Sequence, residues 1–400
     1  MLVYKGVNGM RMRKGYNNNN LKYRNRGIVL QLVATRPIFR ADITKRVGLS
    51  RMAITNIVGE LIDEGYIVES AVDENSLIGR NPILLDIAGS SPLSAGLYIA
   101  RSSIHVILTD IRLKAFYTDK ISLENETKES LMQKIFCILD GLFEFHKSNM
   151  SERRVLGIGI SSIGPFDPEN AELLNPRDFF GIENLPLKDS LESRYSLPVY
   201  AQNDMNASAL AEHLMGQGRS CNNFMYLGIT NGIGAGIIIN RHLYGEGSIS
   251  VGEIGHMSIN YEGPLCSCGN RGCLETYATM PVILKRLERA LGGKKVELED
   301  FKELSENAEC DAVFKDVAEK LSISLVNAVN LLDPERVVIG HEGIYLPERY
   351  LDLMRKEIEA RILSSGYKSV PVVHSAFSMY APLYGSAAII LTRLFAGDRI

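Results

Sequence analysis

The sequence predicts a small N-terminal all-α head, a winged helix–turn–helix, followed by a larger α/β body. Three observations support this fold class: three short helical patterns near the N-terminus, strands that alternate with helices from about residue 94, and an uneven distribution of charge. At 400 residues the chain has room for two or three domains, and 46% apolar with 23% charged residues is ordinary for a globular protein.

The charge of the chain is strongly divided. Residues 1–59 carry twelve lysines and arginines and one acid, Asp42, which gives them a net charge of +11, whereas residues 60–400 carry −14. A basic head favours binding to a polyanion, because neutralised phosphates release counterions. A solvated basic tail with no target has the same composition, so charge alone leaves both readings open. Residues 1–24 are basic and rich in Asn, and we expect them to form a flexible arm.

Nothing in the hydropathy pattern indicates export. No stretch approaches 18 apolar residues, which predicts that no segment spans a membrane. The first residues lack the apolar region and the small-residue cleavage site of a secretory signal. We therefore expect a cytoplasmic protein whose six cysteines are thiols or metal ligands.

The head is predicted to span residues 25–90. It contains three successive helical patterns, at Asn25–Ala34, Phe39–Val47 and Arg51–Glu64. Gly48 supplies the turn before the third pattern, and Ser50 is a natural N-cap for it. Two strands then follow around a loop at residues 73–79, which is typical of a wing.

The third helix carries the candidate DNA-binding residues. Apolar residues from Ile54 to Ile62 face inward, which leaves four outward residues at the N-terminal end of the helix: Arg51, Met52, Thr55 and Asn56. A helix–turn–helix reads the major groove with such positions, and Arg80 at the return of the wing would enter the minor groove. A small helical domain used only for packing is the alternative, and the +11 charge favours DNA binding over it.

The body contains a cluster of metal-binding residues with the spacing His-x9-Cys-x-Cys-x4-Cys. Its members are His256, Cys266, Cys268 and Cys273. Thiolates and imidazole suit tetrahedral Zn²⁺, and four protein ligands leave no open position, so the predicted zinc is structural. Buried free cysteines or a disulfide are the alternatives; a reducing cytoplasm and the strain of a Cys-x-Cys bridge argue against the disulfide.

The residues around this cluster resemble the signature of the ROK family (repressors, open reading frames and sugar kinases). That signature places Glu-x-Gly-His before Cys-x-Cys-Gly-x-x-Gly-Cys-x-Glu, here residues 253–256 and 266–275. Residues 41–69 are similar to the winged helix–turn–helix of many bacterial repressors. The resemblance implies an actin- and hexokinase-like (ribonuclease H-like) body: a small α/β lobe at residues 94–204 and 381–400, and a large α/β lobe with the zinc site at residues 205–380.

The resemblance also implies a sugar site in the cleft between the lobes. Its residues are Gly164, Asn203, Asp204, Glu253, His256 and Glu275. The family uses the carboxylates to accept hydrogen bonds from sugar hydroxyls, and His256 would bind zinc through one ring nitrogen and sugar through the other. In the family's kinases the residue at Asp204 is the general base, so Asp204 is expected to be a vestigial base that still accepts a hydroxyl.

The nucleotide side departs from the family pattern in three places. The Asp-x-Gly-Gly-Thr hairpin of the kinases is replaced here, with Tyr98 in place of Asp and Ala100, Arg101 and Ser102 in place of the later residues. The second phosphate loop reads Thr230-Asn231-Gly232, and the adenine-side loop contains His341-Glu342. We expect no ATP or Mg²⁺ requirement, because phosphoryl transfer depends on positioning and charge neutralisation.

These observations predict a sugar-responsive transcriptional repressor of carbohydrate genes. Its expected partners are double-stranded operator DNA, a sugar inducer and a second copy of the chain in a homodimer. An active ATP-dependent sugar kinase with a DNA-binding head is the first alternative. An activator, or a regulator that answers to a protein partner, is the second.

Overall fold

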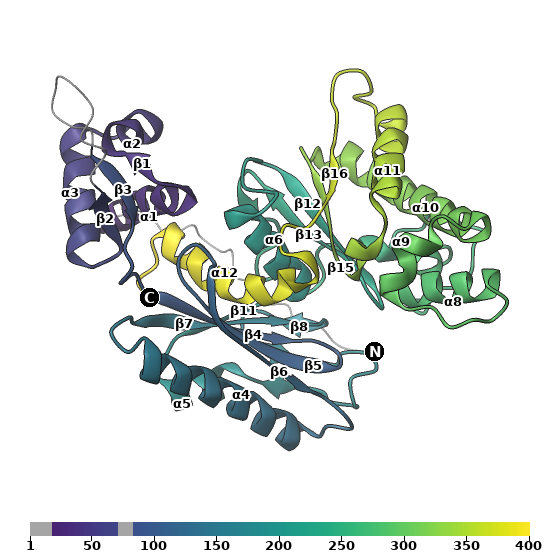
Figure 1. Ribbon diagram of the computed structural model, residues 1–400, viewed down its shortest axis with the longest axis horizontal. Helices are drawn as coiled ribbons and strands as arrows, with labels where there is room; N and C mark the ends of the chain where they lie inside the picture. Colours follow the sequence, from purple (N-terminus) through teal and green to yellow (C-terminus); the bar gives the residue numbers. More distant parts are fainter. Residues whose placement is uncertain (1–17, 71–82) are drawn as a thin grey trace, which may run out of the picture. The chain divides into compact units, whose positions relative to one another are not determined.

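The computed structural model describes residues 18–70 and 83–400. The chain divides into two compact units (Figure 1). The head comprises Met1–Ala88 with Arg393–Arg399, and the body comprises Gly89–Thr392 with Ile400. The last residues were expected to belong to the small lobe of the body, and Arg393–Arg399 instead pack with the head.

In its described residues the head has the three helices that the sequence predicts and one small antiparallel sheet, which adds a strand, β1, to the two expected. The helices are α1 (Asn18–Thr35), α2 (Arg40–Val47) and α3 (Arg51–Asp63). The sheet has the order β1-β3-β2, with β1 at Ile38–Phe39, β2 at Ile67–Ser70 and β3 at Leu84–Ile87. Gly48 ends α2 with a φ of 70°, a conformation that glycine adopts without steric cost, so the chain can turn into α3.

Helix α1 begins earlier than expected, so residues 18–24 are helical and do not belong to a flexible arm. Two contacts explain this difference. Lys22 forms an ion pair with Glu60 of α3 at 2.7 Å, and the ring of Tyr23 lies under the guanidinium of Arg399. Both partners are distant in the sequence, so local propensity does not reveal them. Residues 1–17 lie outside the described residues.

The small lobe of the body is built on a five-stranded sheet with the order β11-β7-β4-β5-β6 (Figure 1). Its strands are β4 (Leu93–Ile99), β5 (Ser103–Thr109), β6 (Ala115–Ser122), β7 (Val155–Ser162) and β11 (Val199–Asn203). Helix α4 (Lys128–Asn149) packs on β5 and β6. Three two-residue strands, β8 (Phe166–Asp167), β9 (Glu172–Leu173) and β10 (Leu185–Pro186), and α5 (Lys188–Tyr195) lead into β11.

Helix α12 (Ala381–Ala396) packs directly on this sheet. A Cβ atom added to Gly159 of β7 would lie 1.9 Å from the carbonyl oxygen of Ser386, so only glycine permits this approach. By length and composition, the window Ser378–Ala396 is apolar enough to cross a membrane, but 67% of it is buried. This burial is typical of the core helix of a folded domain.

The large lobe has a second five-stranded sheet with the order β14-β13-β12-β15-β16. Its strands are β12 (Phe224–Ile229), β13 (Ile233–Ile239), β14 (His242–Leu243), β15 (Val337–His341) and β16 (Val372–His374). Helix α6 (Asp204–Met215) packs on β12 and β13. The remaining helices of this lobe include α8 (Met280–Ala290), α10 (Ala308–Leu332) and α11 (Glu348–Arg361), whose apolar faces join β12, β13 and β15 in one core.

Candidate ligand cavity, metal cluster and DNA-facing helix

Helix α6 begins at the point where β11 ends, and this junction positions two of the predicted sugar-binding residues. Asn203 is the N-cap: its Oδ1 accepts the N–H of Asn206 at 2.8 Å. Asp204 Oδ1 accepts the N–H of Met205 at 2.9 Å. Each side chain therefore holds the helix start with one oxygen, which leaves the amide nitrogen of Asn203 and Oδ2 of Asp204 to meet a ligand.

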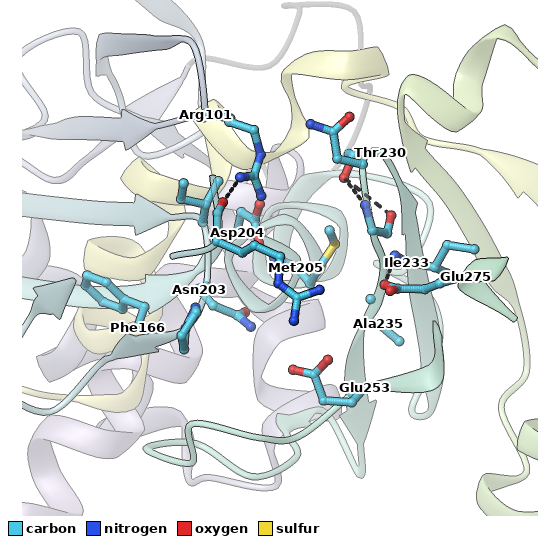
Figure 2. Close-up of a pocket in the computed structure, with 18 of the residues that line it drawn as sticks. Arg101, Phe166, Asn203, Asp204, Met205, Thr230, Ile233, Ala235, Glu253 and Glu275 are labelled. Carbon is cyan, nitrogen blue, oxygen red and sulfur yellow. Dashed lines mark hydrogen bonds between the residues drawn. The ribbon is translucent and has the colours of Figure 1, made fainter. Parts of the chain in front are cut away.

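A cavity of about 530 Å³, here called the ligand cavity, opens at this junction. The structure brings all six predicted sugar-binding residues to its lining: Gly164, Asn203, Asp204, Glu253, His256 and Glu275. Figure 2 shows the start of α6 on one side of the cavity, with Glu253 and Glu275 across from it. The volume lies within the range of small-molecule sites.

The acidic residues of the ligand cavity favour a ligand rich in hydrogen-bond donors. Glu275 Oε1 accepts the N–H of Ile233 at 2.8 Å, and its Oε2 lies 3.8 Å from Nε2 of His256. Burial raises the pKa of Glu253; His256 opposes this effect, while the charges of Glu275 and Asp204 add to it. Neighbouring carboxylates repel one another, and hydroxyl groups that donate hydrogen bonds to them reduce this repulsion. The arrangement therefore suits a polyol.

The four predicted metal ligands lie together next to this cavity. Their ligand atoms are all within 4.8 Å of one another. Sγ of Cys266 lies 3.7 Å from Nδ1 of His256, and Sγ of Cys268 lies 3.7 Å from Sγ of Cys273. A tetrahedral zinc ion with Zn–S bonds of about 2.3 Å separates its ligand atoms by about 3.8 Å. The cluster therefore fits tetrahedral zinc, with Nδ1 of His256 toward the ion and Nε2 toward Glu275.

The chemistry of the three sulfurs also fits a cation. Burial raises the pKa of Cys273, and the neighbouring Cys266 and Cys268 raise it further, to about 12. At Cys266 burial acts in the same direction, but hydrogen bonds from Cys268, His256 and Cys273 outweigh it and lower the pKa to about 6. Ionisation of all three thiols at once is unfavourable because the thiolates would repel one another. A divalent cation between them would compensate this repulsion.

The three altered nucleotide elements meet where the ligand cavity borders a second cavity, beside Asp204. They are the hairpin that begins at Tyr98, the turn at Thr230, and the segment that contains His341 and Glu342. A second cavity of about 680 Å³, here called the neighbouring cavity, shares Tyr98, Thr230 and Glu342 with the first. Burial raises the pKa of Tyr98 well above its usual range, and Asp204, Tyr226 and Glu342 add to this effect, so the phenol stays neutral.

Two residues of this region were not predicted to act in the site. Arg177, in the irregular segment between β9 and β10, lines the ligand cavity and donates from Nη1 to Oγ of Ser267 in the metal loop at 2.5 Å. Its carbonyl oxygen accepts a hydrogen bond from Arg101. His341 was named from the sequence only as part of the altered adenine-side loop, whereas Nε2 of its ring lies 3.7 Å from Oδ2 of Asp204. No sequence pattern marks Arg177; the replacement of a family glycine was the available signal for His341.

In the head, helix α3 presents the predicted DNA-binding side chains. Ser50 caps the helix, since its Oγ accepts the N–H of Ala53 at 3.2 Å. All four predicted residues at the start of the helix are exposed: Arg51, Met52, Thr55 and Asn56. Apolar residues such as Ile54 and Ile57 are buried beneath them. Arg80, the fifth predicted residue, lies outside the described residues.

Comparison with known proteins gives a consistent result for the whole chain. Residues 94–393 match the model of the ROK family. The chain is 29% identical over 396 residues to a xylose repressor from Caldicellulosiruptor bescii, covering 95% of this chain and 98% of that protein.

Two solved structures are similar to this one. A ROK family transcriptional regulator, a homologue of the Escherichia coli Mlc protein, matches with a TM-score of 0.80 at 25% identity, over 94% of this chain and 98% of the other. A ROK glucokinase from Streptomyces griseus, solved with glucose and AMPPNP, matches with a TM-score of 0.61 at 23% identity, over 74% of this chain and 98% of the other. The second likeness shows a shared fold for the body.

Proposed function

Because the chain belongs to the ROK family, we propose that it is a transcriptional repressor of carbohydrate genes whose body binds a sugar without phosphorylating it. One observation carries the proposal: all six predicted sugar-binding residues line one cavity, while the three altered nucleotide elements meet where this cavity borders the neighbouring one. The similarity to a xylose repressor along nearly the whole chain, head included, supports the same function.

The head supplies the DNA-binding half of this function. Helix α3 exposes Arg51, Thr55 and Asn56 at its N-terminal end, where side chains of a recognition helix reach base edges. The partner is double-stranded operator DNA, so the protein acts in the cytoplasm. A homodimer would place two such helices on half-sites about one helical turn apart.

The body supplies the sensing half. The four residues His256, Cys266, Cys268 and Cys273 would hold a structural zinc ion, and Nδ1 of His256 as a ligand would fix the direction of Nε2 in the wall of the ligand cavity. Glu253, Glu275 and Asp204 accept hydroxyl groups of the sugar. Sugar binding favours one arrangement of the body over another, and this shift releases the operator.

The residues at the border between the two cavities argue against phosphoryl transfer. A neutral phenol at Tyr98 brings no carboxylate to a Mg²⁺ ion, and Arg101 puts a side chain where the kinases have bare backbone. Since transfer depends on positioned metal and phosphates, we expect no ATP or Mg²⁺ requirement for sugar binding.

Two substitutions test the proposal. Asp204→Ala and Glu253→Ala should each weaken sugar binding by about tenfold or more, because each removes an acceptor of a charged hydrogen bond, while operator binding is retained. Titration calorimetry with D-xylose, D-glucose and N-acetyl-D-glucosamine measures the first property, and a gel-shift assay measures the second. Glu303→Ala, which removes an exposed acid of α9 (Phe301–Leu304) that does not line the ligand cavity, is the matched control.

Loss of operator binding in both variants, with normal folding, would contradict the division into two functions. An ATP-consumption assay with the same three sugars addresses the kinase alternative. Robust turnover there would overturn the proposal that the body binds sugar without chemistry.

A further inference from the structure

His341 has a backbone conformation that side chains rarely adopt. It ends β15 with φ 52° and ψ −139°, in the region that favours glycine because it has no Cβ atom. A buried residue held in such a conformation costs stability, and strain of this kind concentrates where a side chain has a task. The strained backbone therefore indicates a specific role for the side chain of His341.

The imidazole is buried, with 4% of the residue exposed, and its first nitrogen is engaged. Nδ1 lies 2.9 Å from the hydroxyl oxygen of Tyr226, and the same oxygen accepts the backbone N–H of His341 at 3.1 Å. Burial raises the pKa of Tyr226 far above its usual range, so the phenol keeps its proton and can donate it to Nδ1. This pairing assigns the imidazole proton to Nε2.

The second nitrogen points to Asp204. Nε2 is buried and has no hydrogen-bond partner within the part of the chain that the structure describes. It lies 3.7 Å from Oδ2 of Asp204, the carboxylate oxygen that does not bind the N–H of Met205. His341 lines the neighbouring cavity and Asp204 lines the ligand cavity, so the imidazole stands in the wall between the two.

We propose that His341 is a positioning residue for the ligand: Nε2–H donates to Oδ2 of Asp204 and holds this carboxylate as a hydrogen-bond acceptor for a sugar hydroxyl. A small shortening of the 3.7 Å separation completes the bond. Of the neighbouring groups, the hydroxyl of Tyr226 is already paired with Nδ1 of His341, whereas Nε2 of His341 is buried beside Oδ2 of Asp204 and is otherwise unpaired in the described residues. The inference rests on the proposed sugar binding and deepens it.

The proposal also explains how Asp204 differs from a general base. A donor to Oδ2 of Asp204 occupies one of the lone pairs that a general base would use to accept a proton from a ligand. The imidazole also fills the space between Asp204 and the neighbouring cavity. His341 thereby favours a site that holds a hydroxyl over one that activates it.

Two substitutions at one position separate this role from packing. His341→Leu keeps an apolar side chain of similar length and removes both nitrogens, whereas His341→Gln keeps an N–H donor near the place of Nε2. Titration with D-xylose, D-glucose and N-acetyl-D-glucosamine should show about tenfold or more loss of affinity in the Leu variant, the effect of losing a hydrogen bond to a charged group. The Gln variant should recover most of that loss, and the thermal midpoints of both variants monitor folding.

A measurement on the unchanged protein is independent of those variants. Nitrogen-15 NMR of the histidine side chains should find His341 with its proton on Nε2, and this proton should move downfield when sugar is added. Equal affinity of the Leu variant and the wild type, or equal weakness of the Gln and Leu variants, overturns the proposal. If the wild type binds none of the three sugars, the proposed sugar binding fails; a proton found on Nδ1 then overturns the role of His341 separately.

Discussion

Two groups of side chains in the ligand cavity differ in what they offer a small molecule. The first, Glu253, His256 and Glu275, lies beside a metal cluster, so its acceptors and its imidazole have fixed directions. The second, which includes Tyr98 and Glu342, lies at the boundary with the neighbouring cavity. The first group of side chains suits recognition of hydroxyl groups, whereas Tyr98 and Arg101 stand where the family's kinases have a metal-organising Asp and a glycine.

This difference indicates that sugar binding and phosphoryl transfer depend on separate groups of residues within one fold. Recognition of a polyol depends on side chains whose position is held by local contacts, such as the hydrogen bond from Ile233 to Glu275. Transfer depends on several elements acting together, so the change of a few loop residues removes most of its rate. The sugar-binding group therefore remains useful after the other group has changed.

Disrupting the cluster of predicted metal ligands should produce the largest effect, because it removes the support for the proposed sugar-binding residues. Cys273→Ser takes away a buried ligand and should destabilise the body by several kcal/mol, since binding of a structural zinc is coupled to folding. His256 then loses its fixed direction, and sugar binding is lost. Thermal unfolding with zinc analysis measures the first effect, and calorimetry with sugar measures the second.

Operator binding by the head should survive this change, because the cluster belongs entirely to the body. Cys137→Ser is the control, since this exposed cysteine lies outside the cluster. Loss of operator binding at the same metal content as the loss of sugar binding would contradict the separation of the two functions.

Lowering the pH should produce the next largest effect, a loss of folding stability. It reports on helix α6, which begins at Asp204. Burial lowers the pKa of His213 on this helix to about 4, and the charges of Arg241 and His242 act in the same direction. The unfolded chain takes up this proton near pH 6.5 and the folded chain only near pH 4. The contribution of His213 is therefore complete above about pH 6.5 and is lost as the pH falls toward 4, by up to about 3 kcal/mol.

Urea unfolding at pH 7.5 and at pH 5 measures this slope. His213→Gln should reduce it without abolishing it, because Gln takes up no proton in either state, while His105, whose pKa burial also lowers to about 4, still contributes. His242→Gln, at an exposed neighbouring position, should leave most of the slope in place. An unchanged slope in His213→Gln would show that other groups control the acid response.

Local patterns predicted much of the site. The metal ligands lie within 18 residues of one another in the sequence, so their spacing alone indicates how they converge. The outward face of α3 was also predictable, because helical periodicity separates the buried Ile54 and Ile57 from the exposed Arg51.

Long-range contacts were the part that the sequence did not reveal. The start of α1 at Asn18 depends on Glu60 and Arg399, and the inclusion of Arg393–Arg399 in the head depends on the same packing. The position of His341 depends on Tyr226, 115 residues away in the chain. Such pairings follow from the arrangement of strands, which propensity and periodicity do not determine.

The smallest expected effect concerns the link between the two lobes at the rim of the ligand cavity. Arg177 of the small lobe donates to Ser267 of the metal loop, and it is exposed, so solvent weakens the bond to at most about 1 kcal/mol. Arg177→Ala should weaken sugar binding by about two- to fivefold, mainly through faster dissociation, because the link holds the lobes together around a bound ligand. Stopped-flow measurement of sugar release tests this, with Arg194→Ala, on the outer helix α5, as the control. A tenfold or larger loss would mean that Arg177 contacts the sugar itself and does more than link the two lobes.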